Sequence, residues 1–462
     1  MFLVLALTAG RLSAETPVDL EQEEQVSVRL VLVDVLVTDR SGRTVPGLSQ
    51  DDFTLLVQNR PVDIDTMDAA CATGATPDRL PRSSGTDPFS LPSSRPARVV
   101  LLFDHYHMDM GDRLDALAGA REIVAGEVGT ANEMMVAVLT DGLRILAPFT
   151  SDRATLTLAL DSMEQDVTIW AKLFDPPYRP LTERGYFRDL SRLMSVLAEY
   201  EGAKAVVLFS SFLGRADDND LWFLDVAHRA AESRSAIYPV YARGLEPPQQ
   251  GRKTEPTGGS RALARLANET GGRFTRLTND LTLGYARARR DLECRYTLGF
   301  YLKETGRNGV ENTRNIVIRV RGNGLSARHP ERLREWPVED LRDASVTAAE
   351  LNPERYMDPR ITAGLKLLKP RGERSWKVRL EAQGPPPVGD GTVAILVTRN
   401  RRAVKVYRED LAAGRSLDWA GTLKLAPGEY ELIVVLNDPA QAGPSASVTA
   451  VTVPPVAAGL PR

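Results

Sequence analysis

Residues 98–104, Arg-Val-Val-Leu-Leu-Phe-Asp, decide the fold class of this 462-residue chain. Five consecutive apolar side chains, Val99 to Phe103, precede Asp104 without the alternation expected of a strand with one face in water. Such a run is typical of a strand that is buried on both faces, as in the parallel sheets of α/β proteins. We therefore expect residues 98–104 to form a central strand of an α/β unit.

Helical and strand patterns alternate from this strand as far as residue 293. The alternation predicts a doubly wound (Rossmann-like), mostly parallel sheet over residues 98–293. The expected strands are 134–139, 143–147, 205–209, 236–241 and a short one near 274, and the expected helices are 112–128, 153–163, 186–200, 220–234, 261–270 and 281–293.

The segments that flank the α/β unit have the two-residue period of strands. Residues 24–66 form a small β unit with too few strands to cover its own apolar face, and residues 295–328 contain two strands without covering helices. We expect these two segments to build one β-sandwich into which the α/β unit is inserted. Residues 69–97, rich in Pro, Ser, Gly and Thr, are expected to be a linker.

The C-terminal part returns to alternating strands separated by turns rich in Pro and Gly. Residues 365–456 have the size and pattern of an immunoglobulin-like β-sandwich. Residues 330–361 are polar and charged, so we expect a linker with a short helix there. The strands expected in the C-terminal part are 377–380, 393–397, 423–425, 430–436 and 448–453.

The N-terminus carries an apolar stretch at residues 2–9, followed by small residues around Ser13 and Ala14. This pattern resembles a truncated signal peptide over residues 1–16, and it favours a secreted or periplasmic protein. No other segment approaches the roughly 20 uninterrupted apolar residues of a membrane-spanning helix. We therefore expect no transmembrane span in the mature chain.

The chain has two cysteines, Cys71 and Cys294, too few for a disulfide scaffold or a four-cysteine zinc site. In an oxidising compartment they could form one disulfide between the segment before the α/β unit and the segment after it, provided that their Cα atoms approach within about 7 Å. Two separate buried thiols are the alternative, and the sequence leaves both open.

The charge composition argues against a nucleic-acid partner. The chain has 58 Lys and Arg against 61 Asp and Glu, a formal charge of −3, and no long basic run. We interpret the densest basic cluster as the exposed, solvated turn of a hairpin. It consists of Arg399, Arg401, Arg402 and Lys405.

Several stretches together resemble the von Willebrand factor A family, and their arrangement is similar to that of the bacterial VWFA-related proteins described from Acidobacteria. They are VDVLVTDRSGRTVPGLSQDDFTLL at 33–56, the buried strand ending in Asp104, LARLANETGGRF at 263–274 and DLECRYTLGFY at 291–301. The resemblance implies a von Willebrand factor A domain at 98–293. Members of that fold often bind Mg²⁺ or Mn²⁺ through oxygen ligands at the carboxyl ends of the strands.

The ligand pattern that the resemblance implies is incomplete in this chain. Asp104 matches the first aspartate of Asp-x-Ser-x-Ser, and Thr182 lies where the family threonine would be, but Tyr106 and Met108 replace the two serines. Ser-Ser-Phe at 210–212 stands where Thr-Asp-Gly is usual. With two of five ligands left, we expect a weak, degenerate metal site or none. Asp104 could instead cap the following loop by accepting backbone N–H hydrogen bonds.

A rival pattern is His105-x-His107-x-Asp109, which resembles the zinc-binding motif of metallo-β-lactamase hydrolases. The residue after Asp109 is not His, and only His228 and His329 remain as further imidazole ligands. The chain also has no nucleophile elbow of the Gly-x-Ser-x-Gly type and no phosphate-binding Gly-Lys-Ser/Thr loop. We therefore expect the two histidines to be ordinary loop residues.

These observations favour an exported, non-enzymatic protein of the adhesion or scaffold type. An unidentified protein or peptide would bind the crevice at the strand ends, where large, partly exposed rings are typical interface anchors. A hydrolase using His105, His107 and Asp109, and a purely structural envelope component, are the alternatives. The residues expected to line the crevice are Asp104, His105, Tyr106, His107, Thr182 and Ser211.

Overall fold

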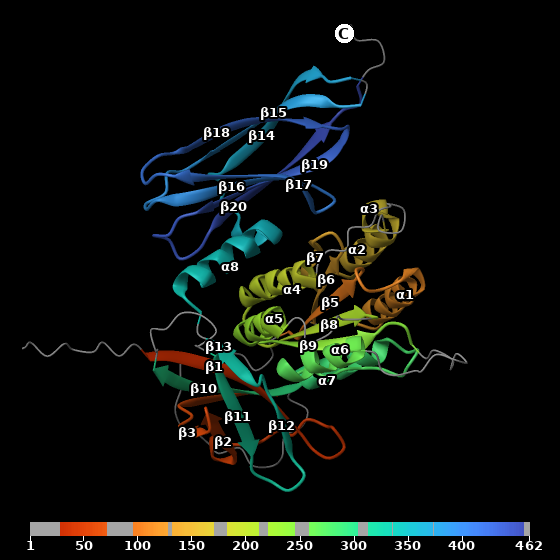
Figure 1. Ribbon diagram of the computed structural model, residues 1–462, viewed down its shortest axis with the longest axis vertical. Helices are drawn as coiled ribbons and strands as arrows, with labels where there is room; N and C mark the ends of the chain where they lie inside the picture. Colours follow the sequence, from red (N-terminus) through yellow and green to blue (C-terminus); the bar gives the residue numbers. More distant parts are fainter. Residues whose placement is uncertain are drawn as a thin grey trace, which may run out of the picture.

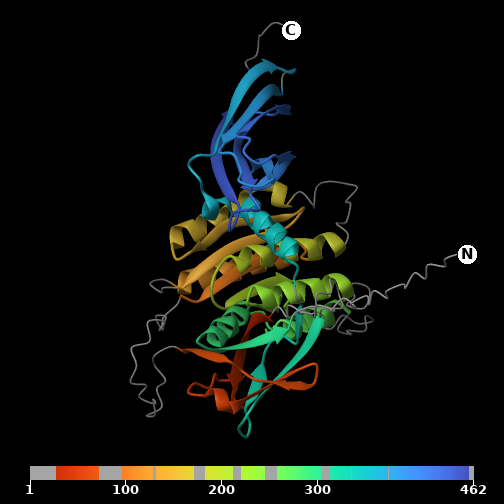
Figure 2. The ribbon, with the colours of Figure 1, turned by 90° about the vertical axis from the view of Figure 1, so that its left-hand side faces the viewer.

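The computed structural model describes residues 28–71, 96–127, 132–170, 183–211, 220–244, 258–303, 313–334, 336–372 and 374–456. Three units stack along the long axis of the molecule: a β-sandwich, a central α/β unit and a second β-sandwich (Figure 1). The view at right angles shows the same order (Figure 2). The expected signal peptide, residues 1–16, lies outside the described residues.

The central unit contains a five-stranded sheet in the order β7-β6-β5-β8-β9. β5 (Arg98–Asp104) lies in the middle and runs parallel to β6 (Glu133–Leu139) and β8 (Lys204–Ser210). β9 (Ser235–Tyr241) is parallel to β8, whereas β7 (Leu143–Thr150) is antiparallel to β6. The predicted combination of α/β structure with many antiparallel strands is confirmed at this level.

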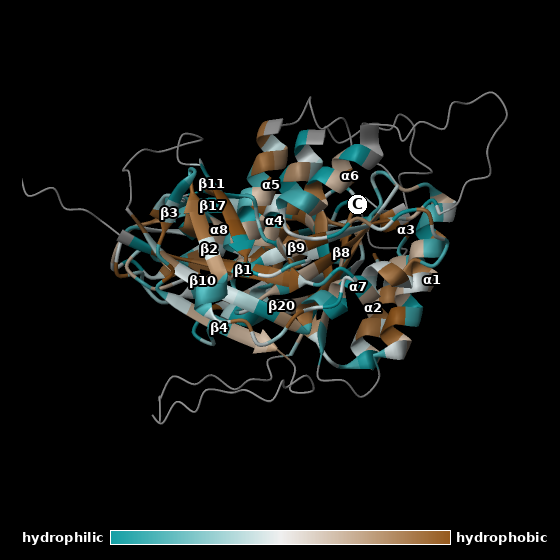
Figure 3. Ribbon diagram, turned by 90° about the horizontal axis from the view of Figure 1, so that it is seen from below, coloured by the Kyte–Doolittle hydropathy of each residue, from teal (hydrophilic) through white to brown (hydrophobic). Residues whose placement is uncertain are grey.

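Helices cover both faces of this sheet. Val99, Leu101 and Phe103 of β5 point toward α1, α2 and α7, whereas Val100 and Leu102 point toward α4, α5 and α6. Burial on both faces explains why β5 has a continuous apolar sequence, and Figure 3 shows the apolar strands enclosed by helices with hydrophilic outer faces. The helices are α1 (Met110–Gly126), α2 (Arg153–Gln165), α3 (Val167–Trp170), α4 (Glu183–Ala198), α5 (Asp220–Glu232), α6 (Gly258–Glu269) and α7 (Thr282–Leu292).

The first sandwich combines strands from both sides of the α/β unit in two sheets, β12-β1-β10-β4 and β13-β11-β2-β3, which share one apolar core. Cys71 lies opposite Cys294 in the β4–β10 pair, and the two are joined by a disulfide. Residues 69–71 belong to β4, so the expected linker at 69–97 was placed too early. The elements are β1 (Val28–Thr38), a 3-10 turn (Gln50–Asp52), β2 (Phe53–Val57), β3 (Arg60–Val62), β4 (Thr66–Cys71), β10 (Cys294–Lys303), β11 (Thr313–Val320), β12 (Ser326–Arg328) and β13 (Arg332–Arg334).

The second sandwich consists of the sheets β14-β15-β18 and β17-β16-β19-β20 around a separate core. The sequence pattern misses β14 and β17 because both are edge strands whose residues are mostly exposed or half-buried, so their apolar alternation is weak. The strands are β14 (Thr362–Pro370), β15 (Trp376–Gly384), β16 (Gly391–Arg399), β17 (Arg402–Leu411), β18 (Leu417–Leu425), β19 (Gly428–Asn437) and β20 (Ser445–Val453).

The basic cluster lies at the β16–β17 hairpin, where Asn400 and Arg401 have positive φ angles of 52° and 60°. It is not simply solvated. Arg402 forms an ion pair with Asp141 in the β6–β7 turn, and Arg401 Nη1 lies 2.7 Å from Glu354 Oε1. The hairpin therefore holds the second sandwich against the α/β unit.

The segment expected to be a linker with a short helix, residues 330–361, contains β13 and a 14-residue helix, α8 (Val338–Leu351). A 3-10 turn (Pro353–Tyr356) follows. α8 lies between the α/β unit and the second sandwich (Figure 1). The buried residues of α8 are Ala348, Ala349 and Glu350, near its C-terminal end, so the sequence indicates only a short helix there. No helix among the described residues is long and apolar enough to cross a membrane.

Candidate binding crevice at the end of β5

Asp104, the last residue of β5, is fully buried and bound to its neighbours on several sides. Ser210 Oγ, at the end of β8, donates to Oδ2 over 2.6 Å, and the backbone N–H of Tyr106 donates to Oδ1 over 3.1 Å. The backbone N–H of His107 also donates to Oδ1, and its Nδ1 lies 2.7 Å from Oδ2. The capping role foreseen for Asp104 is therefore present, with a side-chain bridge to β8 in addition.

Aromatic rings cluster beside Asp104 at the end of β5. The buried ring of Tyr186, in α4, meets His107 edge-on with centroids 4.8 Å apart and meets Tyr106 edge-on at 6.0 Å. Burial, reinforced by the nearby carboxylate of Asp104, raises the pKa of Tyr186 well above its ordinary value. The Tyr186 hydroxyl therefore stays protonated and uncharged at neutral pH.

The His-x-His-x-Asp pattern is not brought together around one point. His105 is buried and its ring packs against Phe103, with centroids 6.4 Å apart. His107 is turned toward Asp104, and Asp109 caps α1 by accepting a 3.0 Å hydrogen bond from the backbone N–H of Asp112. Within the described ranges, no three His, Cys, Asp or Glu side chains are placed to hold a metal ion.

The other two histidines lie far from this loop. His228 is on α5, and His329 lies between β12 and β13, where its Nε2 accepts a 3.1 Å hydrogen bond from the backbone N–H of Ile318. The residues present thus do not fit a zinc site of the hydrolase type. At Asp104, a divalent cation would have to displace the contacts from Ser210 and His107.

A second polar group lies beside the loop that follows β5, and of its members the sequence analysis named only Ser211. Ser211 donates a hydrogen bond to the buried Asp112 in the first turn of α1, and Arg243 Nε lies 3.7 Å from the same carboxylate. Burial raises the pKa of Asp112. Asp112 and Arg243 belong to no motif, so only their positions just after β5 and β9 could have drawn attention to them.

The predicted contact residues differ in accessibility. Asp104, His105 and Ser211 are buried, with 0%, 2% and 3% of their surfaces exposed, whereas Tyr106 and His107 are half-buried. Thr182 lies outside the described residues. A partner could therefore touch only part of the expected set.

Exposed apolar side chains extend this edge of the sheet at the start of α5. Leu221 is 68% exposed and Trp222 is 39% exposed, and the guanidinium of Arg184 lies 5.9 Å from the centre of the Trp222 ring. The sequence analysis did not single out these residues, because an apolar pair at a helix start is also typical of core packing.

No protein-family model matches the sequence, and no curated protein matches it. Among solved structures, the chain is similar to an aerotolerance-related membrane protein from Bacteroides fragilis NCTC 9343, with 13% identity and a TM-score of 0.27 over 42% of this chain and 98% of that one. It is also similar to the conserved hypothetical protein BatB from Bacteroides thetaiotaomicron, with 13% identity and a TM-score of 0.27 over 42% of this chain and 96% of that one. An uncharacterized membrane spanning protein from Vibrio fischeri has 19% identity and a TM-score of 0.15 over 43% of this chain and 99% of that one.

Proposed function

We propose that this chain is an exported, non-enzymatic interaction protein whose α/β unit offers the carboxyl edge of its sheet to a protein or peptide partner. The observation that carries the proposal is the set of rings at this edge: Tyr106 and His107 rest on the buried Tyr186, and Trp222 is exposed at the start of α5. Aromatic side chains held on a rigid base bury a large area at little entropic cost, which makes them effective anchors for a partner.

The state of the acidic groups also supports binding over catalysis. A general acid or base must reach the proton that it transfers, within hydrogen-bond distance of the substrate. Asp104 is buried beneath Ser210 and His107, and Asp112 is bound to Ser211. Both carboxylates therefore act in this proposal as supports for the loop that carries Tyr106 and His107, and any Mg²⁺ or Mn²⁺ binding would be weak.

The disulfide supports an exported location. Bridges such as Cys71–Cys294 persist in oxidising compartments and are rare in the cytosol. It ties together the two strands that lead into and out of the α/β unit, which keeps that unit anchored on the first sandwich. This supports a periplasmic or extracellular location as part of the proposal.

A photo-crosslinking amino acid at position 106 or 222 tests the proposal in the native envelope. We expect both positions to give an adduct of the same mass, because both lie at the proposed contact edge. The matched control is position 158, since Leu158 is also apolar and is 68% exposed, but lies on α2. The absence of an adduct at both 106 and 222 would remove the proposed role and favour a purely structural envelope component.

A further inference from the structure

The disulfide lies at one end of an edge strand in the first sandwich. β4 is the last strand of the sheet β12-β1-β10-β4, so within that sheet it pairs with β10 alone. The pairing runs from Thr66 opposite Gly299 to Cys71 opposite Cys294. The bridge therefore joins the last residue of β4 to the first residue of β10.

Side-chain burial contributes little to holding β4 in place. All six of its residues are exposed or half-buried. Of its apolar side chains, those of Met67 and Cys71 pack against the sandwich core, and both are only partly buried there. On β10, by contrast, Tyr296 and Leu298 are fully buried. Strand pairing with so little apolar burial is marginal in water, so the covalent bridge is a main restraint on β4.

The other end of β4 is held without the bridge. The backbone N–H of Asp65 donates a 2.8 Å hydrogen bond to the carbonyl of Gly299. The carboxylate of Asp65 in turn accepts a 3.2 Å hydrogen bond from the backbone N–H of Tyr301. These bonds fix the residue that precedes β4, so an opened disulfide would leave the strand attached at Asp65 and free at Cys71.

The two sulfur atoms differ in accessibility. Cys71 is half-buried, whereas only 4% of the surface of Cys294 is exposed. Thiol–disulfide exchange begins when a thiolate attacks one sulfur of the bridge, and access decides which sulfur it can reach. Attack is therefore expected at Cys71, with Cys294 as the leaving group.

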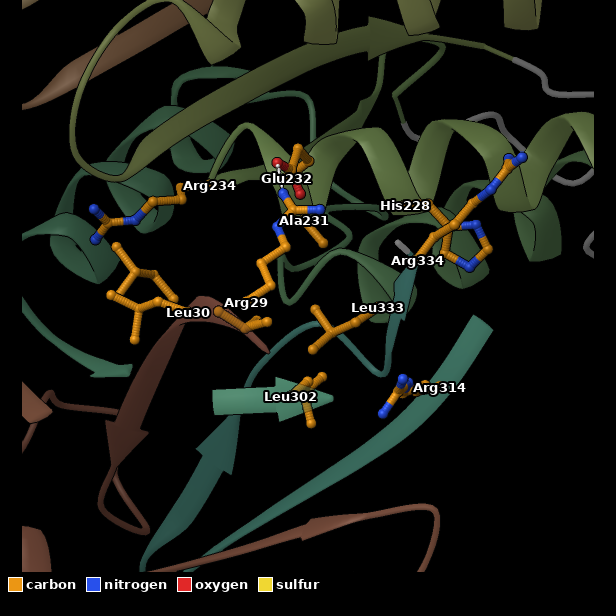
Figure 4. A pocket seen from close by; sticks show the side chains of 12 residues that line it. Arg29, Leu30, His228, Ala231, Glu232, Arg234, Leu302, Arg314, Leu333 and Arg334 are labelled. Carbon is orange, nitrogen blue, oxygen red and sulfur yellow. Dashed lines mark hydrogen bonds and ion pairs between the residues drawn. The ribbon is translucent and has the colours of Figure 1, made fainter. Parts of the chain in front are cut away.

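Ion pairs of β1 hold the α/β unit on the first sandwich without any contribution from β4. Arg29 Nη2 lies 2.6 Å from Glu232 Oε1 at the end of α5 (Figure 4). Asp34, further along β1, is bound to Arg234. The buried residues of the sandwich core come from β1, β2, β10 and β11. These contacts would persist if β4 moved away.

We propose that the Cys71–Cys294 disulfide is a redox-controlled latch. When a dithiol reductant opens it, β4 separates from β10 and remains attached at Asp65, while the sandwich core and the α/β unit stay folded. The edge of β10 at residues 294–299 then lacks a neighbouring strand. Such an edge is a template for pairing with another extended segment, so reduction would change what the first sandwich can bind.

The chemistry of opening is a two-step exchange that passes two electrons to the protein. One thiol of the reductant loses its proton and attacks Sγ of Cys71, the S–S bond breaks, and Cys294 leaves as a thiolate that takes up that proton. The second thiol of the reductant then displaces the sulfur of Cys71 from the mixed disulfide and transfers its proton to it. The products are two cysteine thiols and an oxidised, disulfide-bonded reductant.

Hydrogen exchange on the full chain, before and after reduction by dithiothreitol without denaturant, tests the latch. The amides of residues 66–71 that donate to β10 should exchange about tenfold or more faster after reduction, because their acceptors are lost. Amides in the β1–β10 pairing, over residues 28–35, should keep their protection. Unchanged protection of β4, in protein whose two thiols alkylation shows to be free, would overturn the proposal. Equal acceleration throughout the first sandwich would also overturn it, because the fold and not one strand would then have opened.

The double substitution Cys71→Ser and Cys294→Ser provides a latch that is permanently open. Residues 66–71 of this variant should exchange as fast as in the reduced protein, whether or not dithiothreitol is present. A change that dithiothreitol still produces in the variant would show that the reductant does not act through the disulfide. If the variant fails to fold, reduction of the unaltered chain still decides the question.

A monothiol tests which sulfur is attacked. Brief treatment with glutathione, followed by alkylation and peptide mapping, traps the mixed disulfide of the first step. We expect glutathione on Cys71 and the alkyl group on Cys294. Glutathione mainly on Cys294 would contradict the assigned order of attack.

Discussion

Ser210 Oγ, at the end of β8, donates a 2.6 Å hydrogen bond to Oδ2 of Asp104, at the end of the neighbouring strand β5. Both residues are fully buried. This side-chain hydrogen bond links the carboxyl ends of two adjacent strands, at the edge of the sheet where the candidate site lies. Together with the backbone N–H groups of Tyr106 and His107, it makes Asp104 a support for the loop that follows β5.

Ser210→Ala should lower the free energy of unfolding by about 1–3 kcal/mol, because a buried carboxylate would lose one of its donors. The loss can be measured by urea denaturation. Ser375→Ala is the control: its hydroxyl also makes one hydrogen bond, to the carbonyl of Arg371, but at an exposed site, and it should change stability by less than about 0.5 kcal/mol. Equal effects of the two substitutions would show that the hydrogen bond between β5 and β8 stabilises the fold no more than an exposed hydrogen bond does.

The separation of His105, His107 and Asp109 predicts that the purified protein retains no stoichiometric zinc after extensive dialysis. Only His107 contacts Asp104, and Asp109 is engaged at the start of α1. Zinc content can be measured by inductively coupled plasma mass spectrometry. One zinc per chain that disappears in His107→Ala would contradict the prediction and reopen the hydrolase alternative.

The fold could be predicted from the sequence where the apolar pattern of a segment reflects its burial on every side. The run from Val99 to Phe103 is uniformly apolar because helices cover both faces of β5, so the sequence alone indicates a central strand. Helix α8 has no such apolar pattern. It buries Ala348, Ala349 and Glu350 against two different units, and no periodic stripe results.

The candidate site was predictable only as far as local sequence reaches. Asp104 and its loop follow a buried strand, which marks them in the sequence. The partner that fixes Asp104, Ser210, is 106 residues away, and Trp222 belongs to another helix. Pairing between distant side chains depends on tertiary packing, which spacing along the chain does not encode.

Replacing both cysteines, as Cys71→Ser with Cys294→Ser, should lower the free energy of unfolding by roughly 2–5 kcal/mol. The bridge spans 223 residues of sequence, so its loss frees a long loop in the unfolded chain. Urea denaturation of the oxidised, reduced and doubly substituted proteins measures the effect. The last two should agree. Two free thiols in the native protein, detected by mass spectrometry after alkylation, would contradict the disulfide.

His228 predicts a loss of stability in mild acid. Burial, with Arg334 adding repulsion, lowers its pKa from 6.5 to about 4, and only Asp225 among the neighbouring charges opposes this shift. Between pH 6.5 and 4 the unfolded chain therefore binds a proton that the folded chain does not, so stability falls as the pH falls. A shift of this size corresponds to at most about 3.4 kcal/mol.

His228→Leu removes this proton while leaving the other acid-sensitive groups in place. We expect the fall in unfolding free energy between pH 7 and pH 4.5 to be smaller in the variant by about 2–3 kcal/mol. Urea denaturation at both pH values gives the difference directly. An unchanged pH dependence would mean that His228 is solvated in the folded protein.

Helix α8 provides a way to separate the two units that it joins. Ala348 belongs to the core of the α/β unit, whereas the next residue, Ala349, packs against Leu396 and Ile433 of the second sandwich. An ion pair reinforces the second contact, with Arg408 Nη2 lying 2.5 Å from Glu350 Oε1.

Ala349→Asp would bury a carboxylate against the sandwich, so we expect that contact to open while both cores stay folded. Far-UV circular dichroism should then be unchanged, and limited proteolysis near residues 352–361 should become at least tenfold faster. Ala348→Asp should instead destabilise the α/β unit, and Val338→Asp, at a site that is 66% exposed, should do neither. A helix that packs one face against each of two units must respond differently to a charge on each face. If Ala348→Asp and Ala349→Asp gave the same changes in circular dichroism and proteolysis, α8 would therefore belong to one continuous core.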